Sequence, residues 1–136
     1  MDMQLEVVVL PVSDVDRAKD FYEQAGFRLD TDHRAGDDFR VVQVTPPGSH
    51  CSVSFGVGVS QADPGSIQGL HLVVADLPAV LDELAGRGIE VSEPFHFGPE
   101  GQAPGVDPER RDYASYAAFS DPDGKGWLLQ EVRRRA

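Results

Sequence analysis

The pattern of apolar positions along the chain changes between two periods. Residues 5–12 and 70–74 are rich in β-branched and other apolar residues, which is typical of strands with at least one buried face. After each of these segments, apolar residues recur at the spacing that places side chains on one face of a helix. These helical positions are Val15, Ala18, Tyr22 and Ala25 in the first segment, and Leu77, Val80, Leu81 and Leu84 in the second.

Residues that start and stop helices flank both apolar stripes. Ser13 or Asp14 in the first segment, and Asp76 in the second, can accept hydrogen bonds from the free amide groups of an opening helical turn. Gly26 and Gly88 follow the two stripes and supply the left-handed backbone conformation that commonly ends a helix. The sequence therefore predicts one strand and one helix, in that order, at two places.

These two places are copies of each other. Sliding the chain by 62 residues superposes identical residues, and the apolar positions between them also match. The identical pairs are Leu10 and Leu72, Val12 and Val74, Asp14 and Asp76, Asp20 and Asp82, and Gly26 and Gly88. We expect a single domain over residues 1–136, with one module at about 5–60, a linker at about 61–68 and a second module at about 69–132.

Further strand-like segments follow each predicted helix. They cover residues 27–29, 39–45 and 51–57 in the first half, and 89–91, 116–120 and 127–132 in the second. Turns rich in Pro, Gly and Asp at 46–49 and 121–124 separate the last pair in each half, and residues 95–112 are expected to form a long loop. Each half therefore reads β-α-β-β-β, which predicts an α+β fold.

Composition and charge narrow the classes of partner. The net charge of −11 and the isoelectric point near 4.6 repel polyphosphate, so no nucleic-acid partner is expected. No apolar run approaches the length of a membrane span, and the single cysteine with no leader-like segment before Leu5 predicts a cytoplasmic protein. The basic cluster from Arg133 to Arg135 is expected to be a solvated terminus without a role.

Two motifs within this duplicated frame resemble a known family. They are Val-Ser-Asp-Val-Asp-Arg-Ala-Lys-Asp-Phe-Tyr at 12–22 and Phe-Ser-Asp-Pro-Asp-Gly at 119–124. With the order of elements over residues 5–132, they resemble the vicinal oxygen chelate superfamily of glyoxalases, bleomycin-resistance proteins and dioxygenases. The resemblance implies a curved, cup-shaped mixed sheet with the helices outside, a small molecule bound inside the cup, and a homodimer.

The same resemblance assigns positions to metal ligands, and this chain departs from the pattern there. The matching positions are Val7, Gly69, about Ser54 and about Leu128, which offer at most one weak hydroxyl ligand. We therefore expect no metal and no cofactor.

A shift of one residue in the strand register would change this expectation, because strand side chains alternate between faces. Glu6 and Gln68, with Gln130 or Glu131, could then supply oxygen ligands to a divalent metal. That register would turn the apolar face needed against the helices toward the cup, so it stands as the alternative.

Several side chains are candidates for contact with a ligand. His71 shares a strand face with Gly69 and could act as a general base or as a hydrogen-bonding group. In the segment 107–116, the arginines could bind an anionic group or only the neighbouring carboxylates, and the tyrosines could stack on a ring. The expected ligand-binding positions are Val7, Val9, Ser54, His71, Arg111, Tyr113, Tyr116, Leu128 and Gln130, with His71 the candidate catalytic residue. Trp127 alternates with Leu128 and is expected to pack against a helix.

Three classes of function are compatible with these residues. The first is a metal-free protein that binds or sequesters a small hydrophobic or aromatic molecule, and this class is favoured. The second is a cofactor-free enzyme that uses His71. The third is a metal-dependent lyase or dioxygenase that uses Glu6 and Gln68.

Overall fold

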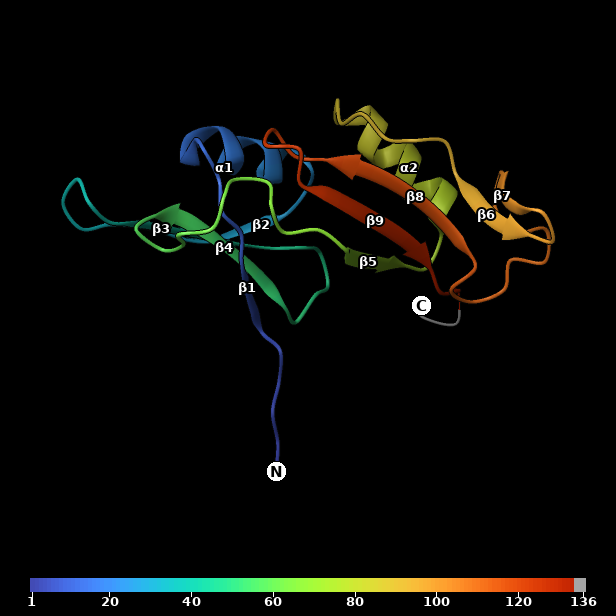
Figure 1. Cartoon of the computed structure of the whole chain (residues 1–136), viewed down its shortest axis with the longest axis horizontal. Helices are drawn as coiled ribbons and strands as arrows, with labels where there is room; N and C mark the ends of the chain where they lie inside the picture. The colour runs from blue at the N-terminus through green and yellow to red at the C-terminus, as the bar shows by residue number, and fades with distance from the viewer. Residues whose placement is uncertain (134–136) are drawn as a thin grey trace. The chain divides into compact units, whose positions relative to one another are not determined.

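Two helices and two mixed β-sheets make up the described part of the chain, as the predicted α+β class requires (Figure 1). A computed structural model describes residues 1–133, so Arg134 and Arg135 of the basic terminus lie outside the described residues. The chain divides into two compact units. The first contains Met1–Ile67 and Asp121–Lys125, and the second contains Gln68–Ser120 and residues 126–133.

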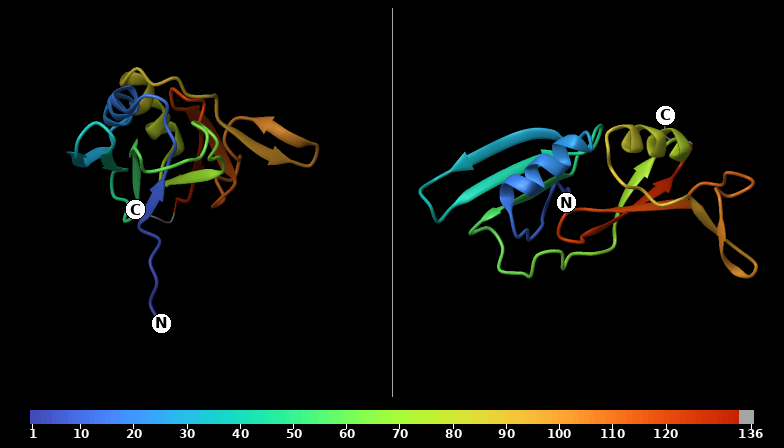
Figure 2. Two further views of the ribbon diagram at one scale, coloured as in Figure 1. Left: turned by 60° about the vertical axis from the view of Figure 1, so that its left-hand side comes forward. Right: turned by 90° about the horizontal axis from the view of Figure 1, so that it is seen from above.

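The first unit has the predicted order of elements. It consists of β1 (Val7–Val9), α1 (Val15–Gln24), β2 (Arg28–Arg34), β3 (Arg40–Thr45) and β4 (Ser52–Val57). The strands lie in the order β1-β4-β3-β2, with β1 parallel to β4 and the other pairs antiparallel. Helix α1 packs on β3 and β4 and lies along the sheet in Figure 2.

Local contacts explain where α1 begins and which face it buries. Asp14, rather than Ser13, caps the helix, since its carboxylate accepts a hydrogen bond from the Arg17 amide at 3.1 Å. Ala18 and Tyr22 lie on the buried face, as the apolar stripe predicted. The Tyr22 ring packs at 5.2 Å from Phe27, centroid to centroid.

A segment from late in the sequence completes the core of the first unit. The turn 121–125 connects two strands of the second sheet, yet it belongs to the first unit. The Tyr22 hydroxyl donates to the buried carboxylate of Asp121 at 2.7 Å, and the Lys125 amide donates to the same carboxylate at 2.9 Å. Buried polar groups of this kind require partners, so the turn and the helix hold each other in place.

The second unit departs from the predicted pattern. It consists of β5 (Leu70–Val74), α2 (Leu77–Gly86), β6 (Phe95–Gly98), β7 (Gly101–Pro104), β8 (Ser115–Ser120) and β9 (Gly126–Glu131). The strands lie in the order β5-β9-β8-β6-β7, with β5 parallel to β9. Helix α2 packs on β8 and β9, and the hairpin β6–β7 projects from the edge of its sheet in Figure 2.

The structure differs from three of the predicted segments. No strand forms at 89–91, because Ile89 is buried beside the end of α2 and its amide donates to the Leu84 carbonyl at 3.0 Å. The predicted loop 95–112 contains the hairpin β6–β7, whose two-residue turn is followed by Gly101 with φ +104°. Strand β2 extends to Arg34, beyond the predicted 27–29, because a polar edge strand lacks the apolar run that marks a buried one.

None of the helices within residues 1–133 is long and apolar enough to cross a membrane.

Candidate functional site

The sheet of the second unit has one covered face and one open face. Trp127, Leu129 and Glu131 are buried on the covered face, where the Glu131 carboxylate accepts a hydrogen bond from the Leu77 amide of α2. Contact between Trp127 and a helix stays a prediction. Strand alternation places the neighbouring side chains on the other face. There the registers align His71 with Leu128, Val73 with Gln130, Gln130 with Tyr116, and Leu128 with Ala118. Four of these residues, His71, Tyr116, Leu128 and Gln130, were predicted to contact a ligand.

A chain of hydrogen bonds connects the polar side chains of this open face. His71 Nδ1 lies 2.9 Å from Gln130 Oε1. Gln130 Nε2 donates to the Tyr113 carbonyl at 3.0 Å and lies 3.3 Å from the Tyr116 hydroxyl. The Gln130 side chain of β9 therefore contacts side chains from β5 and β8, and the Tyr113 backbone supplies the third contact of its amide.

An aromatic cluster adjoins these polar groups. The Tyr116 ring stacks on Phe95 with 5.6 Å between centroids, and Phe97 meets Tyr116 edge to face at 5.7 Å. Phe97 is 59% exposed, so part of its ring is accessible from solvent. The open face thus places an exposed aromatic surface beside hydrogen-bonding groups.

Phe95 and Phe97 were missed by the sequence analysis. They lie on β6, inside the segment predicted to be a loop. The alternation Phe-His-Phe at 95–97 is the signal that could have indicated a strand with both rings on one face. His96 points differently, since its Nδ1 lies 2.8 Å from the Gly105 carbonyl.

The predicted ligand-binding residues of the first module lie on the sheet of the first unit. Val7 pairs with Ser52, and Val9 pairs with Ser54 across the parallel β1–β4 ladder. Val7 and Val9 are exposed, whereas Ser54 is buried. Their contact with a ligand stays a prediction.

The alternative metal ligands have other surroundings. Glu6 is exposed and lies before β1, whereas the Gln68 side chain accepts a hydrogen bond from the Gly126 amide at 2.9 Å. Gln130 lies on the open face, and Glu131 is fully buried on the other face. Among residues 1–133, no group of three or more His, Cys, Asp or Glu side chains is placed to hold a metal ion.

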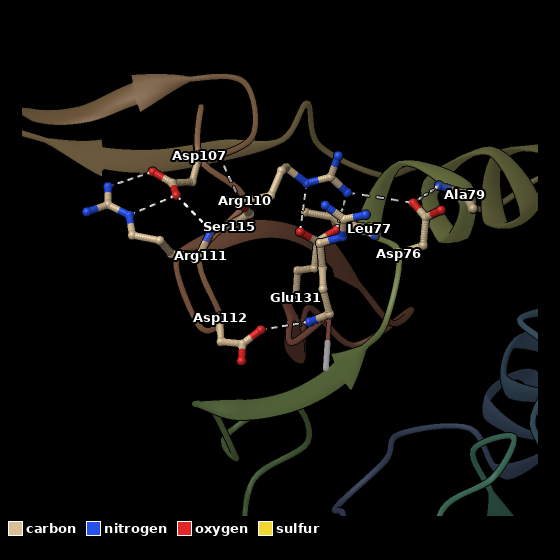
Figure 3. A network of polar contacts seen from close by, with 10 residues as sticks. Asp76, Leu77, Ala79, Asp107, Arg110, Arg111, Asp112, Ser115 and Glu131 are labelled. Carbon is tan, nitrogen blue, oxygen red and sulfur yellow. Dashed lines mark hydrogen bonds and ion pairs between the residues drawn. The ribbon is translucent and has the colours of Figure 1, made fainter. Parts of the chain in front are cut away.

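Both arginines of the segment 107–116 bind carboxylates of their own unit (Figure 3). Arg111 donates through Nε and Nη2 to the buried Asp107 at 3.0 and 2.8 Å. These hydrogen bonds hold the pKa of Asp107 well below its ordinary value. Arg110 donates through Nε to Glu131 at 2.8 Å. The structure therefore supports the alternative in which these arginines bind neighbouring carboxylates. Binding of an anionic ligand by Arg111 stays a prediction.

The Arg110–Glu131 pair also connects this segment to α2. Glu131 is fully buried, and it accepts a hydrogen bond from the Leu77 amide in the first turn of α2 at 2.8 Å. The Arg110 hydrogen bonds lower the pKa of Glu131, and the Leu77 amide adds to the effect. The Tyr113 amide donates to the Glu131 carbonyl at 2.8 Å. Glu131 therefore also positions Tyr113, whose own carbonyl accepts the hydrogen bond from Gln130 Nε2.

Comparison with known proteins agrees with this fold and these motifs. The family model of the Glyoxalase/Bleomycin resistance protein/Dioxygenase superfamily matches residues 4–129. The chain belongs to this superfamily, which confirms the resemblance found in the sequence.

Solved structures include similar proteins from two bacterial sources. TnmS3, an antibiotic binding protein from Streptomyces sp. CB03234, is 34% identical, with 96% of each chain covered and a TM-score of 0.71. A glyoxalase/bleomycin resistance protein from the same organism is also 34% identical, with 93% of this chain and 99% of that chain covered and a TM-score of 0.69. A superfamily member from Sphaerobacter thermophilus is 28% identical, with 96% and 98% covered and a TM-score of 0.71. Among curated proteins, none matches the chain significantly.

Proposed function

We propose that the protein binds a small aromatic or apolar molecule on the open face of the β5-β9-β8-β6-β7 sheet, and that it does so without a metal. The observation that carries this proposal is the exposed Phe97 ring beside Tyr116, next to the hydrogen-bonded pair of His71 and Gln130. Ligand sites typically combine apolar or aromatic walls with a few placed polar groups. The similarity to an antibiotic binding protein supports the same class of function.

Phe97 provides the direct test of this proposal. Phe97→Ala is expected to weaken the binding of naphthalene derivatives about threefold to fivefold, because the variant loses one aromatic contact. Ligand fluorescence titrations measure the dissociation constants. Phe39→Ala is the matched control, since Phe39 is also exposed, at 37%, but lies in the first unit. Equal losses in both variants, or no binding by the unaltered protein, would contradict the proposal.

The absence of a metal requirement has its own test. We expect less than one equivalent of Zn, Ni, Mn or Fe per chain after gentle purification, because the positions matching the family's ligands are Val7, Ser54, Gly69 and Leu128. Elemental analysis of the purified protein gives the metal content. One equivalent of metal that disappears in Glu6→Ala would instead establish the alternative site at Glu6 and Gln68.

A further inference from the structure

We infer that Gln130 fixes the neutral His71 ring with its hydrogen on Nδ1, so that the open face offers an unprotonated Nε2 as an acceptor beside the Tyr116 hydroxyl as a donor. The ligand class that fits this pair is a hydroxylated aromatic molecule. The statement about the ligand rests on the proposed function, whereas the statement about the His71 tautomer does not.

The first step concerns the orientation of the Gln130 amide. A backbone carbonyl can only accept hydrogen bonds. The amide atom that lies 3.0 Å from the Tyr113 carbonyl oxygen must therefore be the nitrogen, Nε2. The atom that faces His71 is then the amide oxygen, and chemistry rather than the choice of rotamer makes this assignment.

The second step follows for the His71 ring. An amide oxygen can only accept, so the ring nitrogen 2.9 Å from Gln130 Oε1 must carry a hydrogen. In a neutral imidazole only one nitrogen is protonated, so Nε2 keeps its lone pair. His71 is exposed, and no residue within 1–133 donates a hydrogen bond to Nε2. This acceptor is therefore available to a ligand.

The third step concerns the Tyr116 hydroxyl. The Gln130 amide nitrogen has two hydrogens, one of which goes to the Tyr113 carbonyl, and the other is directed to the Tyr116 oxygen at 3.3 Å. An oxygen that accepts this hydrogen bond keeps its own O–H for donation. The described residues supply no acceptor for that hydrogen, so Tyr116 can donate it to a ligand.

Together these groups select the chemistry of the ligand. The Tyr116 and Phe97 rings, 5.7 Å apart between centroids, favour a flat aromatic molecule. The lone pair of His71 Nε2 favours a molecule with a hydroxyl hydrogen to donate, and the oxygen of that hydroxyl or of a neighbouring group can accept from Tyr116. Gln130 is then a positioning residue, because it acts on the ligand through His71 and Tyr116.

The tautomer is tested without any ligand. Long-range proton–nitrogen correlation spectra of protein labelled with nitrogen-15 at histidine, recorded near pH 8 where an ordinary imidazole is neutral, distinguish a protonated nitrogen from an unprotonated one. The His71 signals are assigned by their loss in His71→Ala. We expect the Nδ1–H form in the unaltered protein and a shift toward the Nε2–H form in Gln130→Leu.

Gln130→Glu is the matched variant. Its carboxylate oxygens still accept from His71 Nδ1 but no longer donate to Tyr113 and Tyr116, so the Nδ1–H form should persist. Thermal unfolding and far-UV circular dichroism establish that each variant is folded. An Nε2–H form in the unaltered protein, or the same tautomer in Gln130→Leu as in the unaltered protein, would overturn the inference.

The ligand class is tested with two probes that differ by one hydrogen-bond donor. We expect 2-naphthol to bind about tenfold more tightly than 2-methoxynaphthalene, and we expect Gln130→Leu to remove this preference. Equal binding of both probes by the unaltered protein would overturn the ligand class alone. If neither probe binds, the proposed function and the ligand class both fail, while the spectra still decide the tautomer.

Discussion

Replacing Arg110 with alanine is expected to lower the free energy of unfolding by about 2–3 kcal/mol. The substitution removes the guanidinium that binds Glu131, a carboxylate with no exposed surface. A buried carboxylate without its partner is strongly destabilising, by about 3–5 kcal/mol for fully buried pairs. The partial exposure of Arg110, at 26%, reduces the expected loss to the lower limit of this range or just below it. Chemical denaturation at pH 7 measures the change.

Two control variants isolate the cause of this loss. Arg87→Ala removes a similar side chain whose distance to Glu83 is 3.9 Å at the surface, and it should cost less than about 0.5 kcal/mol. Arg110→Lys keeps the charge but not the two-pronged geometry, so it should restore part of the stability. A loss in Arg110→Ala no larger than that in Arg87→Ala would show that Glu131 does not depend on this pair.

The same pair predicts the dependence of stability on pH. The folded protein holds the pKa of Glu131 below its ordinary value of 4.5, because Arg110 donates hydrogen bonds to the ionised form. A depressed pKa contributes stability that is present above 4.5 and is lost as the pH falls through the lower folded value. The difference between the unaltered protein and Arg110→Ala should therefore be largest near neutrality and should shrink below pH 4.5.

Replacing His71 with alanine is expected to weaken the binding of 2-naphthol by about tenfold to a hundredfold while leaving the fold intact. The side chain is exposed on the open face, so its removal leaves no cavity in the core. Its hydrogen bond to Gln130 is the contact within its own unit that the substitution removes. Fluorescence titration and thermal unfolding of the same preparation separate binding from stability.

His71→Asn distinguishes two roles for the same position. Asparagine supplies an amide oxygen that can accept a hydrogen bond, so it should recover part of the affinity if His71 serves as an acceptor. It cannot transfer protons near neutral pH, so it should recover no turnover if a substrate is found and His71 is its general base. If affinity and turnover are both unchanged in His71→Ala, His71 has only a structural role, and Tyr116 becomes the better candidate for the functional residue of this site.

The elements that local patterns define could be predicted from the sequence. Asp14 and Asp76 begin helices that end before Gly26 and Gly88, because capping, apolar spacing and left-handed stops act within a few residues. The hairpin at 95–104 escaped prediction because its strands have four residues each, and its Gly and Pro residues are equally typical of a loop. Strands as short as these can be identified only once their pairing is known, and β6 pairs with β8, a strand that lies later in the sequence.

The candidate site could be predicted only in part. His71, Tyr116 and Gln130 were each expected to bind a ligand, and the strand registers bring them together on one face. Their hydrogen bonds could not be predicted, because the contact between His71 and Gln130 joins residues 59 positions apart and depends on the register of β5 against β9. The same limit applies to Arg110, whose partner Glu131 lies 21 positions away.

The contact between Tyr22 and Asp121 has a consequence for the time at which the first unit can finish folding during synthesis. These residues are 99 positions apart, although both belong to the first unit. At about 5–20 residues per second, the ribosome adds Asp121 roughly 5–20 seconds after Tyr22. During that interval α1 and its sheet lack the carboxylate that satisfies the Tyr22 hydroxyl. The first unit is therefore completed by a segment that is synthesised 99 residues after Tyr22, and a nascent chain stopped before residue 121 would expose an unfinished core.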